Sequence, residues 1–208
     1  MDKFLVAGVG PGSREYLLPI TEKKAEEADV LIGGLRALEL FSNLEKEKLE
    51  ITANLKEIRD YIRDNYQEKK ILVLVSGDPG LYSLLKYLKR YFSSEKIEVI
   101  PGVSALQLGF ARANLVWQDA KIISLHGSKD LDKLFRAVKE EKKVGLFTDG
   151  DFPPDEIAEY LVEQGIEGKK GFVAENLSYS SERIVDKKLG ELTDKSFGSL
   201  NVMVIYDE

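Results

Sequence analysis

Three short glycine-containing segments could hold a ligand through backbone groups. They are Gly8–Gly12, Ser76–Gly80 and Pro101–Ala105. Glycine lets the backbone turn sharply and approach a ligand without side-chain obstruction, and proline restricts the turn. Each segment follows an apolar run that is typical of a buried strand, and α/β sheets bind ligands at the carboxyl ends of such strands. The segments therefore predict a shared binding site made largely of peptide N–H and carbonyl groups.

Two common phosphate-binding motifs do not fit the first segment. In a dinucleotide fingerprint, a third glycine belongs where Ser13 stands, and an acid should follow the second strand, where the chain has Gly33-Gly34. A P-loop is excluded because no Gly-Lys-Ser/Thr sequence follows. Taken alone, the first segment could equally be a structural turn.

Two side chains of the other segments have alternative roles. Asp78 could accept hydrogen bonds from a ligand, or it could stabilise the turn at Pro79 through its own backbone. Ser104 could cap a following helix, or it could present its hydroxyl to a ligand at the positive helix end. The sequence leaves both pairs of alternatives open.

Composition excludes several kinds of site. The 208 residues include no cysteine and one histidine, His126, so disulfides, thiolate metal sites and multi-histidine metal centres are excluded. An all-carboxylate Mg²⁺ site stays open, and we assign no metal ligands. The net charge of −6 lacks the basic surplus of a general nucleic-acid binder. No apolar run approaches the roughly 18 residues of a membrane span, and the N-terminus shows no signal-peptide pattern. We expect a cytoplasmic protein, which the absence of cysteine favours.

The elements that must position these loops alternate between strands and helices, which is typical of βαβ units and a mainly parallel sheet. Leu55, Ile58, Tyr61 and Ile62 form the apolar stripe of a surface helix. The other predicted helices begin near Thr21, Leu131 and Asp155. The predicted strands cover residues 4–9, 30–32, 49–51, 71–75, 97–100, 122–125, 144–148 and 171–174.

The last part of the chain lacks a long helix between its strands. Residues 181–188 and 201–206 are strand candidates, and we expect them to pair antiparallel at a sheet edge. The pattern restarts after Pro101, so we divide the chain into two α/β domains, 1–114 and 115–208. The first should hold a mainly parallel sheet and the second a mixed one.

The three segments, in this order and at this spacing, resemble the signature loops of the tetrapyrrole (corrin/porphyrin) methylases. The remaining chain resembles the branch of this family that methylates C5 of cobalt-precorrin-7 or precorrin-7. The likeness runs from Lys3 to Ile205. The segments that carry the narrower resemblance are Ala28–Val30, Gly33–Leu38, Trp117–Ala120, Ser124–Gly127, Leu146–Asp149, Glu175–Leu177 and Glu182-Arg183.

The resemblance implies a function and a set of site residues. It implies methylation of a corrin precursor by S-adenosylmethionine in cobalamin biosynthesis, with the donor in a cleft between the domains. His126 could position the substrate or merely pack its domain, and Arg14 and Arg36 could bind substrate carboxylates or remain surface charges. The implied donor contacts are Pro11, Gly77, Asp78, Leu81, Ser104, Ala105, Phe147 and Leu177.

Three features depart from the family pattern. Ser128 stands where the branch often has arginine, so no arginine contact is expected there. Residues 16–21 are longer than the usual segment, which could alter the entrance of the cleft. Gly33-Gly34 replaces an aspartate of the uroporphyrinogen methylases, which argues against that reaction.

Other functions of the same family stay open, namely another precorrin methylase or diphthine synthase. A non-catalytic module that only binds the donor is a further alternative. The resemblance implies a homodimer. Because 208 residues leave no room for a second catalytic domain, methylation at C15 and decarboxylation would need a separate protein.

Overall fold

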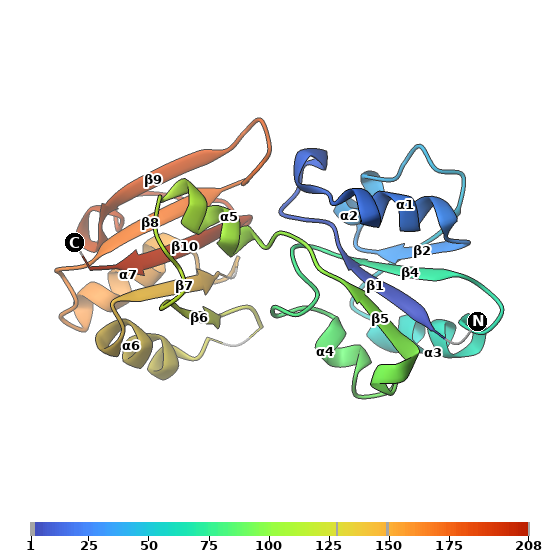
Figure 1. Cartoon of the computed structure of the whole chain (residues 1–208). Helices are drawn as coiled ribbons and strands as arrows, with labels where there is room; N and C mark the ends of the chain where they lie inside the picture. The colour runs from blue at the N-terminus through green and yellow to red at the C-terminus, as the bar shows by residue number, and fades with distance from the viewer. Residues whose placement is uncertain (1–2, 128, 149, 208) are drawn as a thin grey trace. The chain divides into compact units, whose positions relative to one another are not determined.

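A computed structural model describes residues 3–127, 129–148 and 150–207. The chain divides into two compact units, Met1–Ser104 and Ala105–Glu208, each built on its own five-stranded sheet (Figure 1). This division differs from the predicted boundary after residue 114. Helix α5 (Ala105–Arg112) accounts for the difference, because it packs on strands β7 (Lys143–Phe147) and β10 (Asn201–Tyr206) of the second sheet.

The first sheet is wholly parallel, in the order β3-β2-β4-β1-β5. Strands β4 and β1 lie next to each other inside the sheet, and their apolar residues have little exposed surface. Because neighbouring strands are parallel, the carboxyl ends of β4, β1 and β5 lie side by side at one edge. The strands are β1 (Phe4–Gly8), β2 (Val30–Gly33), β3 (Glu47–Glu50), β4 (Ile71–Val75) and β5 (Ile97–Ile100).

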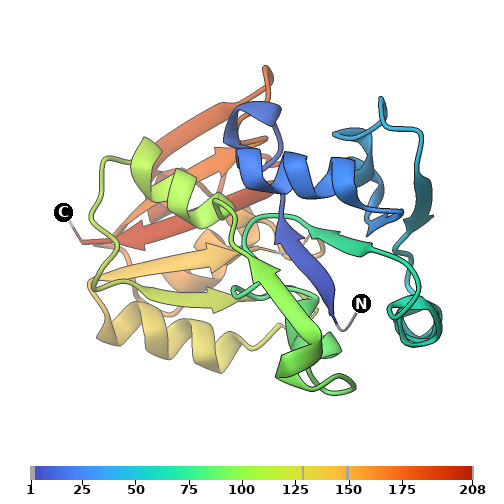
Figure 2. The ribbon, with the colours of Figure 1, turned by 45° about the vertical axis from the view of Figure 1, so that its right-hand side comes forward.

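Helices cover both faces of this sheet (Figures 1 and 2). Side chains of β4 alternate between the two faces: Val73 packs with α3 (Leu55–Asn65) and α4 (Leu85–Leu88), and Leu74 packs with α1 (Pro19–Glu27) and α2 (Leu35–Glu39). Ile58 and Ile62 of α3 are buried, which confirms the predicted apolar stripe.

The second sheet is mixed, in the order β6-β7-β10-β8-β9. Strands β6 and β7 are parallel, and the remaining neighbours are antiparallel. The prediction for the two last strands was half right. Strand β9 (Arg183–Lys188) lies at the edge beside β8 (Lys170–Glu175), but β10 lies in the centre because the apolar residues 202–205 are buried on both faces. Strand β6 spans Lys121–Ser124.

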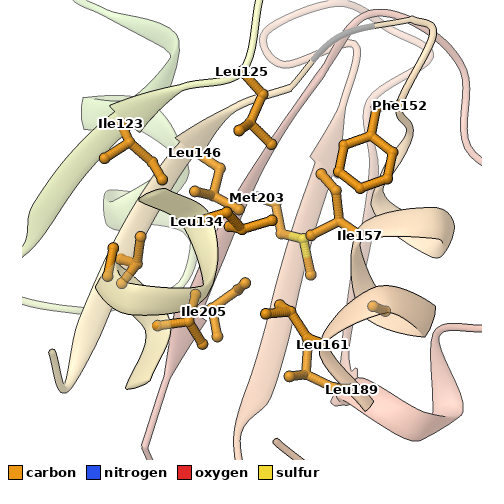
Figure 3. Packing of buried hydrophobic residues seen from close by; sticks show 14 of the residues in the cluster. Ile123, Leu125, Leu134, Leu146, Phe152, Ile157, Leu161, Leu189, Met203 and Ile205 are labelled. Atoms are coloured by element: carbon orange, nitrogen blue, oxygen red, sulfur yellow. The ribbon is translucent and has the colours of Figure 1, made fainter. Parts of the chain in front are cut away.

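One face of this sheet carries the core of the second unit (Figure 3). Leu134 of α6 (Leu131–Glu140) and Ile157 of α7 (Pro154–Glu163) pack there against Leu146 and Met203. The other face bears α5. A Cβ atom at Gly145 of β7 would lie 3.0 Å from the Phe110 ring, so glycine allows this helix to approach closely.

Three short 3₁₀ turns complete the elements, at Arg14–Tyr16, Ser94–Lys96 and Leu189–Glu191. Among the helices of the described residues, none is long and apolar enough to cross a membrane. The predicted fold class, two α/β units with a parallel first sheet and a mixed second one, is confirmed.

Candidate functional site

The three predicted loops meet at the carboxyl edge of the first sheet. The Gly77 N–H donates to the Gly10 carbonyl at 2.9 Å, which makes a bridge between the first two loops. Asp78 joins the second loop to the third: its Oδ2 accepts the Gly102 N–H at 3.0 Å, and its Oδ1 accepts the Gly80 N–H at 2.7 Å. Backbone hydrogen bonds and one carboxylate therefore hold the loops as a single structure.

Glycine is needed here chiefly so that the loops can pack on one another. A Cβ atom at Gly8 would lie 2.2 Å from the Gly77 carbonyl oxygen and 2.8 Å from the Gly102 Cα. A Cβ atom at Gly102 would lie 2.3 Å from the same oxygen. Gly10 and Gly77 also have positive φ angles, 82° and 66°, which side chains with a Cβ atom disfavour. These glycines therefore serve the backbone itself, beyond any room they leave for a ligand.

Six candidates lie on these loops or directly after them, namely Pro11, Gly77, Asp78, Leu81, Ser104 and Ala105. Asp78 stabilises the loops, since both of its oxygens accept backbone hydrogens, and its contact with a ligand stays a prediction. Pro11 and Leu81 are half-buried, and the Leu81 N–H donates to the Asp78 carbonyl at 3.2 Å. Ser104 is buried at the end of the third loop, and Ala105 begins α5.

The charges on the loops are sparse. The segments 8–13, 76–81 and 101–105 contain no lysine or arginine and one acid, Asp78. A ligand bound here would meet peptide dipoles and one carboxylate, and no basic side chain of the loops.

The second unit brings its own candidates to one edge of its sheet. Phe147 ends β7 and pairs with Val202 near the start of β10, and Asn201 pairs with Glu175 at the end of β8. His126 follows β6, which runs parallel to β7, so it belongs to the same edge. Leu177 comes two residues after β8.

Side-chain hydrogen bonds organise this second edge. Thr148 Oγ1 donates to Asn201 Oδ1 at 2.7 Å. The buried Glu175 carboxylate accepts the Gly198 N–H at 2.5 Å and pairs with Arg183 Nε at 2.5 Å. Thr148, Glu175 and Arg183 belong to the segments that carry the family resemblance, and no role was predicted for them. An acid directly after a buried strand was the signal that could have identified Glu175.

Leu177 lies in a loop with unusual backbone angles. It is buried, and its neighbours Asn176 and Ser178 have φ angles of 48° and 72°. Glu182 Oε2 accepts the Ser178 N–H at 2.7 Å, and Glu182 Oε1 accepts Arg112 Nε of α5, also at 2.7 Å. The hydrogen bond from Arg112 lowers the pKa of Glu182 from its ordinary value.

The charged candidates differ in their surroundings. His126 is exposed in the turn after β6, where its backbone N–H donates to Ser124 Oγ at 3.2 Å. Arg14 donates to the Leu40 carbonyl at 2.6 Å and pairs with Glu22 at 2.8 Å, so its guanidinium ties together the helices of the first unit. These contacts give Arg14 a structural role, and its binding of substrate carboxylates stays a prediction. Arg36 is exposed on α2.

Two motif residues, Ser128 and Asp149, lie outside the described residues, so the predicted lack of an arginine contact at position 128 stays a prediction. Within residues 3–127, 129–148 and 150–207, no group of three or more histidine, aspartate or glutamate residues could hold a metal ion.

Comparison with known proteins agrees with this arrangement. A protein of Methanocaldococcus jannaschii named probable cobalt-precorrin-7 C(5)-methyltransferase is 39% identical over 204 residues, covering 96% of this chain and 95% of that protein. The cobalt-precorrin-7 C(5)-methyltransferase of Salmonella typhimurium is 33% identical over 179 residues, covering 86% and 87% of the two chains.

A solved structure shares the fold. Uroporphyrin-III C-methyltransferase of Thermus thermophilus, complexed with S-adenosylhomocysteine, has a TM-score of 0.78 at 19% identity and covers 98% of this chain and 97% of its own. The model of the tetrapyrrole (corrin/porphyrin) methylases matches residues 3–193. With a family match over most of its length and two near-full-length relatives, the chain belongs to the tetrapyrrole (corrin/porphyrin) methylase family.

Proposed function

We propose that this chain transfers a methyl group from S-adenosylmethionine to C5 of cobalt-precorrin-7 or precorrin-7 in cobalamin biosynthesis. The observation that carries the proposal is the 39% identity to the Methanocaldococcus jannaschii protein over nearly the full length of both chains. A likeness of this extent leaves no large segment of that relative without a counterpart here. The Salmonella typhimurium relative supports the same carbon of the same substrate.

The three loops of the first unit fit the methyl donor. The sulfonium and the amino group of S-adenosylmethionine carry positive charge, and the loops contain no basic side chain that would repel them. Peptide N–H and carbonyl groups at the sheet edge suit the ribose hydroxyls, since they offer both donors and acceptors. We assign donor contacts to Pro11, Gly77, Asp78, Leu81, Ser104 and Ala105, and also to Phe147 and Leu177.

The protein contributes to this reaction mainly by positioning the methyl donor and the corrin substrate. The bond from sulfur to the methyl carbon breaks as the bond from that carbon to C5 forms, and the positive charge disperses as the sulfonium becomes a thioether. Holding the reacting carbons about 3 to 3.5 Å apart and in line provides most of the rate that a protein can supply. Backbone loops without a catalytic triad are adequate for this task. C5 loses its proton afterwards, and water can accept it.

Calorimetry with S-adenosylhomocysteine tests the donor site. We expect one binding site per chain, and a loss of at least about tenfold in affinity for Leu81→Ala, since Leu81 is assigned as a donor contact and its φ angle is not positive. The absence of heat and of any thermal shift at millimolar ligand would contradict the proposal. Leu88→Ala in the core below provides a control for general loosening, because it should lower stability without this specific loss.

Three further properties of the chain are proposals that the family resemblance implies. We expect a homodimer, and light scattering that gives 23.4 kDa over a wide concentration range would contradict it.

We expect a separate protein to methylate C15 and to decarboxylate, because the chain matches single-step relatives over 95% and 87% of their lengths. The cytoplasmic location stays a prediction.

A further inference from the structure

The loop that carries Leu177 is held in a conformation that its own residues disfavour. Asn176 and Ser178, on either side of Leu177, both have left-handed backbone angles. Asparagine tolerates this region better than most residues, whereas serine has no such advantage. Such angles persist only where the surroundings enforce them, and they gather at functional sites. The contacts that enforce them are therefore of interest.

Glu182 makes the contacts that fix Ser178. Its Oε2 accepts the Ser178 N–H at 2.7 Å, which closes the loop on itself. Its Oε1 accepts Arg112 Nε at 2.7 Å, and Arg112 Nη2 donates to Oε2 at 3.4 Å. The Glu182 side chain is 19% exposed and that of Arg112 is 36% exposed, so water screens this pair less than a fully exposed one.

Arg112 belongs to α5, the helix that Leu177 contacts at Gly109. A Cβ atom at Gly109 would lie 3.9 Å from Leu177 Cδ1, so the leucine packs where α5 has no side chain. Gly109 and Arg112 are three residues apart on α5 and lie on one side of it. The helix thus supports Leu177 directly at Gly109 and indirectly through Arg112 and Glu182.

We infer that Glu182, anchored by Arg112, is a positioning residue that holds Leu177 in the conformation required to bind the methyl donor. The inference rests on the proposed function, in which Leu177 is a donor contact. Glu182 itself need not touch the donor, because it acts on the backbone of the Leu177 loop. Without Glu182, Ser178 can leave its left-handed conformation and Leu177 can leave Gly109.

The test is a double-mutant cycle read by calorimetry with S-adenosylhomocysteine. Glu182→Ala should weaken binding about five- to twentyfold, and Leu177→Ala should weaken it to a similar degree. The double variant should bind about as well as Leu177→Ala alone, because a residue that acts through Leu177 has no effect once that side chain is gone. Glu182→Gln, which keeps an acceptor for Ser178, should have a smaller effect than Glu182→Ala.

Asp207→Asn is the matched control for Glu182→Gln. Asp207 pairs with Lys169 at the opposite end of the second sheet, so this variant removes a paired carboxylate from the same unit without reaching the loop. Its dissociation constant should stay within twofold of that of the unchanged protein. If Glu182→Ala fails to fold, Arg112→Lys and Glu182→Gln replace it in the binding measurements. In these two variants, the amides of residues 177–181 should exchange at least about tenfold faster than in the unchanged protein.

The outcomes separate the two claims. If the unchanged protein binds S-adenosylhomocysteine and the Glu182 variants bind it equally well, the inference is overturned and the proposed function stands. Effects of Glu182→Ala and Leu177→Ala that simply add would also overturn it. If the unchanged protein does not bind the ligand at all, the proposed function fails and the inference fails with it.

Discussion

The candidate residues gather at one edge of each sheet, and the two edges are built by different means. The first edge lies at the carboxyl ends of β1, β4 and β5, and the second at the carboxyl ends of β6, β7 and β8. In the first unit, backbone groups and glycines make the edge, with Asp78 as the one acid that joins its loops. In the second unit, side chains make it, through Thr148 with Asn201, Glu175 with Arg183, and Glu182 with Arg112. The first edge should therefore tolerate almost no added atoms, whereas the second should fail when a charge or hydrogen bond is removed.

The largest effect is expected from adding one methyl group to the first edge. Gly8→Ala places a Cβ atom 2.2 Å from the Gly77 carbonyl oxygen, and backbone atoms cannot move aside cheaply. We expect a loss of about 3 kcal/mol or more in the free energy of unfolding. Urea denaturation measures it. Gly34→Ala is the control, since a Cβ atom there meets nothing within 4 Å; equal losses for the two variants would contradict the account.

Removing a buried carboxylate from the second edge should have the next largest effect. Glu175→Ala leaves the Gly198 N–H and the Arg183 guanidinium without their acceptor. Because Arg183 is half-exposed, water compensates for part of the loss, and we expect about 2 kcal/mol of destabilisation by urea denaturation. Glu159→Ala, at an exposed position of α7, should change stability by less than about 0.5 kcal/mol. A loss at position 175 as small as this would show that the network is not structural.

His126 tests function at the second edge. Because it is exposed in the turn after β6, His126→Asn should leave the melting temperature nearly unchanged. If it positions the substrate by one hydrogen bond, turnover should fall roughly three- to tenfold, with donor affinity unaltered. Steady-state kinetics measure turnover, and calorimetry measures donor affinity for the same variant. A fall beyond a hundredfold with intact donor binding would indicate an obligatory proton acceptor, which the proposed reaction does not require.

The smallest effect is expected from the pH dependence of the Glu182 pair. Arg112 lowers the pKa of Glu182 in the folded state from its ordinary value of 4.5, so the pair stabilises the fold fully above that value. This contribution is lost as pH falls below 4.5 and through the lowered pKa. Between about pH 6 and pH 3, the unchanged protein should lose up to about 1 kcal/mol more than Glu182→Gln. Parallel pH profiles of stability for the two proteins would contradict the expected shift.

The same contrast explains what the sequence could predict. Apolar periodicity located α3, the strands of the parallel sheet and the end of β9, because local burial patterns determine those elements. The glycine loops were visible for the same reason, since glycine and proline mark the turns in which they occur. No local pattern indicates that Gly8 and Gly102 face each other across the Gly77 carbonyl, because that contact depends on how strands are ordered in the sheet.

Features that depend on tertiary contacts were less predictable from the sequence. Residues 201–206 were expected at a sheet edge because no long helix separates them from residues 181–188, but the sheet order places β10 in the centre. The left-handed angles at Asn176 and Ser178 have no glycine to announce them. Arg14 was a candidate for substrate carboxylates or a surface charge, and folding brings Glu22 and the Leu40 carbonyl to its guanidinium. The contacts behind these features form only on folding, as between Arg112 and Glu182, which lie 70 positions apart in the chain.

Methyl transfer to the corrin ring tests the central claim most directly. The purified chain would be incubated with S-adenosylmethionine labelled with ¹³C in its methyl group, and with cobalt-precorrin-7 or its metal-free form in parallel. The account predicts that ¹³C nuclear magnetic resonance finds one labelled methyl group per ring, at C5, in at least one of the two incubations. A label at another carbon would indicate a different precorrin methylase, and a protein that binds the donor but labels neither substrate would contradict the account.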